Sequence, residues 1–268
     1  MKKSLAALSA LNFCFIFLLS ISGSLEGTLS DVVYYLSFVI SVALFFAASK
    51  RLEIPLMPPR VTISRGNIGI ILAFMAPSLC LIFLVSYLTS LALSHFGTGA
   101  IADASGNLFF VMLTYAVITP ILEEMLFRYI PLSLLAQHSK KGAILYSAAF
   151  FAFVHCSLYQ LPYAFLAGVI FAFFDIISES IIPSLLLHTM NNAISVLWLR
   201  YSGDALFSRV YVIILLSLAL ASIPIIIALR GKLKKRLELV RSDQGKIPLS
   251  IGAFAFFGAT LLIAFINL

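Results

Sequence analysis

The stretch Thr119-Pro-Ile-Leu-Glu-Glu-Met-Leu-Phe-Arg128 places two carboxylates and one guanidinium inside a long apolar run, residues 107–136. A run of this length is typical of a helix that crosses a bilayer, because about 20 residues span the hydrocarbon core. Each ionisable side chain at the centre of such a helix costs about 2.5–3.5 kcal/mol. The sequence therefore indicates a membrane-spanning helix whose charged residues are candidates for a functional site.

The composition extends this interpretation to the whole chain. Hydrophobic residues make up 62% of the 268 residues and charged residues only 11%, with a mean hydropathy of +1.08. Too few polar residues remain to cover a water-soluble core. We predict a single integral membrane domain, residues 1–268, folded as an all-α polytopic transmembrane helical bundle of eight to nine spans. The apolar runs that define the spans are 4–22, 31–49, 67–94, 107–136, 142–157, 161–177, 181–199, 208–229 and 248–267.

The basic residues predict the orientation of these spans. Fifteen of the 18 Lys and Arg residues fall in loops on one side, and only Arg200 and Arg209 fall on the other. The positive-inside rule then predicts nine spans, with the first retained and the N-terminus inside, and we expect a bacterial inner (cytoplasmic) membrane. Because the net charge of +7 lies between apolar spans, the expected partner of these loops is the lipid bilayer and not nucleic acid.

Three spans carry polar residues where hydrocarbon is expected. On a helix, Glu124 and Arg128 are four residues apart and can pair on one face, whereas Glu123 points about 100° away. His155 lies near the end of the span 142–157. His188 and Asn192 are again four residues apart and share a face.

Pro120, one turn before this charged group, disturbs the helix locally. It either starts a helix, with Thr119 as the cap, or kinks one by leaving the carbonyl of Ala116 without a donor.

Taken singly, each polar group is compatible with simple hydrogen bonding between helices. Together, a carboxylate, two imidazoles and a carboxamide on three spans are an expensive way to fasten helices. A water-activating centre accounts for the set better, because glutamate and histidine take a proton from water and histidine or asparagine stabilises an oxyanion. The residues alone do not decide which glutamate acts.

The three segments resemble the motifs of the type II CAAX prenyl endopeptidase (CPBP) family, over about residues 107–200. Ser147, Gly168 and Pro183 agree with the family pattern, whereas Tyr129 stands where the family commonly has glycine. The motifs EExxxR, FxxxH and HxxxN appear in order as Glu123, Glu124 and Arg128, then Phe151 and His155, then His188 and Asn192.

The resemblance implies an intramembrane endopeptidase with residues 107–200 as its catalytic core and a peptide or membrane protein as substrate. By resemblance, Glu123 and His155 activate water, and His188 and Asn192 form the oxyanion site. Glu124 and Arg128 would support the structure. One difficulty remains at this point: counted along the helices, Glu123 and His155 lie about 20 Å from the basic side but His188 only about 10 Å.

Other interpretations remain open. Glu123, His155 and His188 would also suit a catalytic Zn²⁺ ion, although we favour a mechanism without a metal or other cofactor. A non-enzymatic membrane factor, such as a bacteriocin immunity or scaffold protein, is a second alternative, and a transporter with a proton relay is a third. Asp175 and Glu179 are expected to be interfacial charges at the basic-side end of their span.

Overall fold

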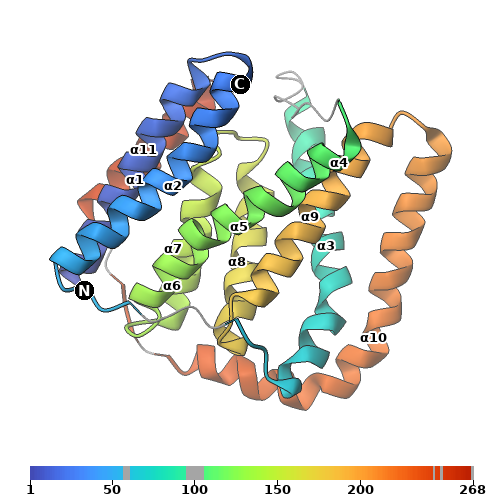
Figure 1. Cartoon of the computed structure of the whole chain (residues 1–268). Coiled ribbons are helices and arrows are strands. Elements are labelled where there is room, and N and C mark those ends of the chain that lie inside the picture. Colours follow the sequence, from blue (N-terminus) through green and yellow to red (C-terminus); the bar gives the residue numbers. More distant parts are fainter. Residues whose placement is uncertain (57–60, 95–105, 244, 248–249, 267–268) are drawn as a thin grey trace.

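The structure is a computed structural model that describes residues 1–56, 61–94, 106–243, 245–247 and 250–266. Every regular element in this part of the chain is helical (Figure 1). The elements are α1 (Lys2–Gly23), α2 (Gly27–Arg51), α3 (Arg65–Leu93), α4 (Leu108–Val111), η2 (Met112–Ile118), α5 (Thr119–Glu124), η3 (Met125–Tyr129), α6 (Ile130–Leu135), α7 (Lys140–Phe153), α8 (Leu161–Ser178), α9 (Ile182–Tyr201), α10 (Ala205–Arg241) and α11 (Ile251–Ile266).

The predicted helical membrane bundle is confirmed. Elements α4 to α6 form one continuous helix, Leu108–Leu135, so the described residues contain nine long helical segments, in line with the eight to nine predicted spans. Six of these are long and apolar enough to cross a membrane by themselves. The other three are α7 and α11, which are short, and α9, which carries the polar residues of the third motif.

The helix Leu108–Leu135 is irregular on both sides of its glutamates. The segments η2 and η3 are π-helical, with α5 between them. Pro120 has no N–H to donate to the carbonyl of Ala116, so the α pattern is interrupted there. Thr119 makes no side-chain cap. Of the two expectations for Pro120, the structure therefore has the one in which proline disturbs a continuing helix.

A second proline couples this helix to α7. Pro131 cannot donate to the carbonyl of Phe127 four residues earlier. The Ser147 hydroxyl donates to that carbonyl over 2.5 Å, and Ser147 is fully buried. A carbonyl freed inside a membrane protein needs such a partner, so the hydroxyl on α7 fixes the position of α7 beside the charged segment.

Helix α7 is too short to cross the hydrocarbon. Its 14 residues extend about 21 Å, compared with a core of about 30 Å. The prediction that His155 lies on a helix is wrong, because α7 ends at Phe153 and residues 154–160 form turns before α8 begins at Leu161. Non-helical backbone at this depth is stable where it is covered by protein or borders a polar space. Residues 154–160 are all partly buried.

Helices α7 and α8 approach each other closely at a glycine. A Cβ atom at Gly168 would lie 2.7 Å from the Cα of Ala148, which is closer than two non-bonded carbon atoms approach each other. Because Gly168 has no side chain, α8 can pack directly on the backbone of α7. The partners of α8 on its other side include α3 and α9 (Figure 1).

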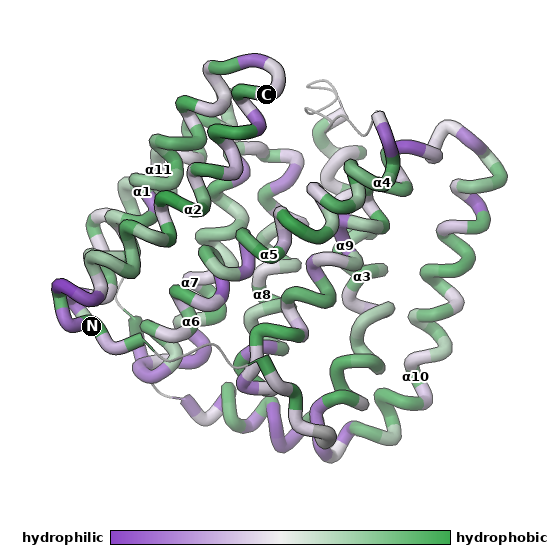
Figure 2. Tube along the Cα trace, viewed as in Figure 1, coloured by the Kyte–Doolittle hydropathy of each residue, from purple (hydrophilic) through white to green (hydrophobic). Residues whose placement is uncertain are grey.

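The two chain ends lie at opposite ends of the bundle (Figure 1). Helix α10 first runs along the bundle, contains Pro224, and then turns to cross the end where the N-terminus lies. Figure 2 shows hydrophilic residues gathered at that end. Beyond α10, backbone N–H groups of Gly245, Lys140 and Lys141 donate to the Asp243 carboxylate and hold its pKa below the usual range.

We predict that Gly168→Ala lowers the free energy of unfolding by about 1–3 kcal/mol, because the added methyl group meets backbone atoms that cannot move aside. Thermal unfolding in detergent measures this. The matched control is Gly258→Ala in α11, where an added Cβ has no neighbour within 4 Å and stability should be kept or slightly raised. Equal effects at the two positions would contradict the close approach of α7 and α8.

Candidate active site

One imidazole lies between the two glutamates of the first motif. His188 Nδ1 lies 2.7 Å from Glu124 Oε1, and His188 Nε2 lies 3.2 Å from Glu123 Oε2. All three residues are at most 9% exposed. Glu123 and Glu124 therefore point in different directions from their helix, as predicted, but both carboxylates contact the His188 ring, at opposite nitrogens. Helices α5 and α9 are joined at this point.

Arg128 neutralises Glu124, as the spacing predicts. Its Nε atom lies 3.6 Å from Glu124 Oε2, and the side chain is fully buried. The guanidinium lies 4.3 Å from the centre of the Phe151 ring and 5.8 Å from that of Phe171, within the range of cation–π attraction. The Nε and Nη2 atoms have no hydrogen-bond partner. Aromatic faces thus take the place of several polar contacts.

His155 lies in the turn after α7 with a defined orientation. Its Nδ1 atom lies 2.6 Å from the carbonyl oxygen of Phe151. A carbonyl can only accept, so Nδ1 carries the proton and donates. The Nε2 atom of the neutral ring is then an acceptor. His155 also lies within electrostatic reach of Glu123 and His188, so the two histidines and the glutamate share one region.

Phe151 connects the parts of this region. Its ring centre lies 4.9 Å from that of His155 and 5.4 Å from that of His188, with the planes nearly perpendicular in both pairs. The same ring faces Arg128. The aromatic residue of the second motif therefore contacts residues of all three motifs, a role that the sequence pattern did not reveal.

Asn192 lies one turn beyond His188 and contacts a different partner. Its Nδ2 atom donates to the Tyr115 carbonyl of η2 over 2.9 Å, and its Oδ1 atom accepts from Asn191 over 3.4 Å. The carboxamide has two N–H groups, so one remains for another acceptor. No hydrogen bond joins Asn192 to either glutamate among the described residues.

The turn between α8 and α9 leads into the helix that carries His188. Ser178, Ser180 and Ser184 are buried, whereas Glu179 between them is exposed, so the turn reaches the protein surface only at Glu179. Leu229 and Leu233 of α10 pack against the apolar cluster that contains Ile177 and Leu187, one on each side of this turn. His188 lies at the level of Glu123, because the two side chains are in contact, so the difference in depth counted along the sequence is absent from the structure.

Asp175 is a correction to the sequence-based expectation. It is 6% exposed, not interfacial, and its Oδ1 atom accepts from the backbone N–H of Ser184 over 3.0 Å. It thereby caps the helix that carries His188 four residues later. Glu124 and Arg128 lie within its electrostatic reach. The spacing could have shown this, because Gly168, Phe171 and Asp175 recur on one face of α8.

Two tyrosines near the site were also missed. Tyr34 of α2 and Tyr163 of α8 both lie within electrostatic reach of Glu123 and pack against the main apolar cluster. A phenol in an apolar run looks like a packing residue, so no sequence pattern marks these two tyrosines. Tyr129, which replaces the family glycine, stacks on Phe46 of α2 at 6.3 Å and does not enter the site.

The proposed zinc ligands do not fit a metal in this arrangement. The Nδ1 atoms of His155 and His188 face the Phe151 carbonyl and Glu124, so only their Nε2 atoms could serve as metal ligands. Within the described ranges, no three His, Cys, Asp or Glu side chains are placed to hold a metal ion.

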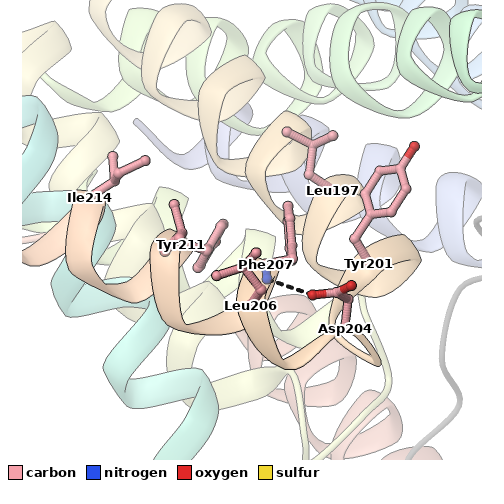
Figure 3. Close-up of a pocket in the computed structure, with 8 residues that line it drawn as sticks. Leu197, Tyr201, Asp204, Leu206, Phe207, Tyr211 and Ile214 are labelled. Atoms are coloured by element: carbon pink, nitrogen blue, oxygen red, sulfur yellow. Dashed lines mark hydrogen bonds between the residues drawn. The ribbon is translucent and has the colours of Figure 1, made fainter.

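A separate apolar pocket of about 570 Å³ lies between α9 and α10 (Figure 3). It is lined by Leu197, Tyr201, Asp204, Leu206, Phe207, Val210, Tyr211 and Ile214. Asp204 is engaged in capping α10, with its Oδ1 atom 2.8 Å from the N–H of Phe207. None of the site residues lines this pocket, and we assign it no role.

We predict that Asp175→Ala lowers the free energy of unfolding by about 0.5–2 kcal/mol, the usual effect of losing a helix cap. Asp175→Asn retains a carbonyl oxygen for the Ser184 N–H and should stay closer to wild type. Thermal unfolding in detergent compares the two, with the exposed Asp31→Ala as control. An alanine variant as stable as the control would contradict the capping role.

Residues 105–194 match the family model described as Type II CAAX prenyl endopeptidase Rce1-like. The match begins before α4, ends within α9, and contains every residue of the three motifs. No curated protein and no solved structure gives a significant match to the chain. The resemblance predicted from the motifs is therefore confirmed over residues 105–194 of this multi-pass membrane protein, which are similar to the type II CAAX prenyl endopeptidase Rce1-like family.

Proposed function

We propose that the protein is an intramembrane endopeptidase in which Glu123 and His155 activate water. The observation that carries this is the convergence of two buried carboxylates and two imidazoles from three separate elements. Such groups are costly in a bilayer, and a hydrolytic centre uses all of them. Residues Glu124 and Arg128 hold the geometry.

In the proposed reaction, Glu123 or the unprotonated Nε2 atom of His155 accepts a proton from water. The resulting hydroxide oxygen bonds to the carbonyl carbon of the substrate, and the carbonyl π electrons move onto its oxygen. When that intermediate collapses, the C–N bond breaks and the proton passes to the leaving nitrogen. The products are a carboxylic acid and an amine.

The oxyanion of the intermediate needs hydrogen-bond donors. We assign this role to the remaining N–H of Asn192 and to the Nε2–H of His188, which faces Glu123 and can donate to the oxyanion once the Glu123 carboxylate has taken the proton from water. Glu124 would keep His188 protonated at Nδ1, since that atom can donate to the Glu124 carboxylate. Glu124 therefore acts on the chemistry through His188 and not directly.

The proposed substrate is a peptide or a membrane protein. We propose that the protein lies in a bacterial cytoplasmic membrane with its N-terminus inside. Most Lys and Arg residues lie in loops on the same predicted side of the membrane as the N-terminus.

We predict that Glu123→Gln reduces peptide-bond hydrolysis by about 10²–10⁴-fold, the usual contribution of a general base. Mass spectrometry counts the newly formed peptide termini in membranes that contain the wild-type protein and in membranes that contain the Glu123→Gln variant. Peptides that co-purify with the Glu123→Gln variant but not with wild type would identify the substrate by trapping.

The matched control is Glu26→Gln, which makes the same change at an exposed position outside the site. It should cleave like wild type. If Glu123→Ala or His155→Ala keeps full biological function at normal expression, the protein is a non-enzymatic membrane factor and the proposal fails.

We also predict that prolonged chelation leaves hydrolysis by purified protein unchanged, because no three His, Cys, Asp or Glu side chains of the described residues are grouped as metal ligands. The measurement is the cleavage rate before and after dialysis against a zinc chelator. Loss of activity that added Zn²⁺ restores would assign Glu123, His155 and His188 to a metal and overturn the metal-free mechanism.

A further inference from the structure

The last part of α10 has no role in the proposed catalysis, yet it is the most basic segment of the chain. Residues 230–241, here called the basic segment, contain six Lys or Arg residues and one acidic residue, Glu238. Helix α10 is 37 residues long, about 56 Å, which exceeds the hydrocarbon thickness of about 30 Å. Part of it must therefore lie outside the hydrocarbon.

The basic segment has a fixed position. It crosses the end of the bundle after the helix turns (Figures 1 and 2). Leu233 and Val240, seven residues apart and thus on one face, pack against the cluster that contains Ile70 and Ile177. The segment is therefore docked on α3 and α8, and its two flanks lie on either side of the face formed by Leu233 and Val240.

Both flanks combine basic side chains with an exposed leucine. By helical spacing, Leu239 lies beside Lys232 and Lys235, and Leu237 lies beside Lys234. Each leucine is 45% exposed. In water these leucines would be unfavourable, whereas at a membrane interface they enter the acyl boundary while the lysines meet phosphate groups. The pattern is that of an interfacial helix.

The charges of the basic segment have no ion-pair partners among the described residues. The positive surface continues to α7, where Lys141 Nζ donates to the carbonyl of Arg241 over 2.7 Å. A partner with fixed negative charge and adjoining apolar chains complements this surface.

We propose that the basic segment binds anionic glycerophospholipids, with phosphates at Lys232, Lys234 and Lys235 and acyl chains at Leu237 and Leu239. Because its inner face packs against the apolar cluster that contains Ile177 and Leu187, on either side of the turn between α8 and α9, bound lipid also stabilises the region that holds His188. This proposal does not depend on the proposed protease activity.

The test is native mass spectrometry of the purified full chain in detergent, titrated with phosphatidylglycerol or phosphatidylcholine. Wild type should prefer phosphatidylglycerol, and Lys232→Gln/Lys234→Gln/Lys235→Gln should weaken that binding on the order of 100-fold. The matched control, Lys2→Gln/Lys3→Gln/Lys50→Gln, removes the same charge from other helices and should bind like wild type. Equal losses in the two triple variants would overturn the site.

Two wild-type measurements keep the test decisive if the variant folds poorly. Phosphatidylglycerol should raise the melting temperature, and this rise should shrink as salt increases from ~0.1 M to ~0.5 M. No preference over phosphatidylcholine would overturn the proposal. So would tighter binding of a polyglutamate peptide that displaces the lipid, because the surface would then belong to an acidic peptide.

Discussion

The contact of His188 with both Glu123 and Glu124 is the interaction on which the site depends. Removing one member of a buried ionic group of this kind leaves an uncompensated charge and typically costs 3–5 kcal/mol. The contact joins α5 to α9, and Arg128 with Phe151 extends it to α7. The geometry of the site and the packing of the bundle are consequently parts of one structure.

Pro120 and Pro131 interrupt the α-helical hydrogen bonding of the helix that carries the two glutamates. Each removes one backbone donor from the helix Leu108–Leu135, and the helix responds with π-helical turns on both sides of α5. Ser147 then satisfies the carbonyl of Phe127 that Pro131 cannot reach. In a bilayer, water cannot supply such a partner, so an irregular helix needs a neighbouring helix at a defined place. Irregularity near the glutamates therefore fixes α7, and with it the turn that carries His155.

Incomplete spans bring the catalytic candidates to one level. Helix α7 is shorter than a bilayer crossing, and the turn between α8 and α9 buries Ser178 and Ser180 and exposes Glu179. His155 follows the first of these interruptions and His188 follows the second, so both rings lie deep in the bundle. The second interruption is stabilised by Asp175, which caps α9, and is covered by α10.

The sequence alone determined the helical membrane bundle, the approximate spans and the residues of the three motifs, because hydrophobic length and local helical spacing are properties of neighbouring residues. It also predicted the pairing of Glu124 with Arg128. Only the tertiary structure decided that His188 contacts both glutamates, that His155 follows the end of α7, and that Asp175 is buried. These features depend on where each helix stops relative to the others, and contacts between residues 64 positions apart set that, as for His188 and Glu124.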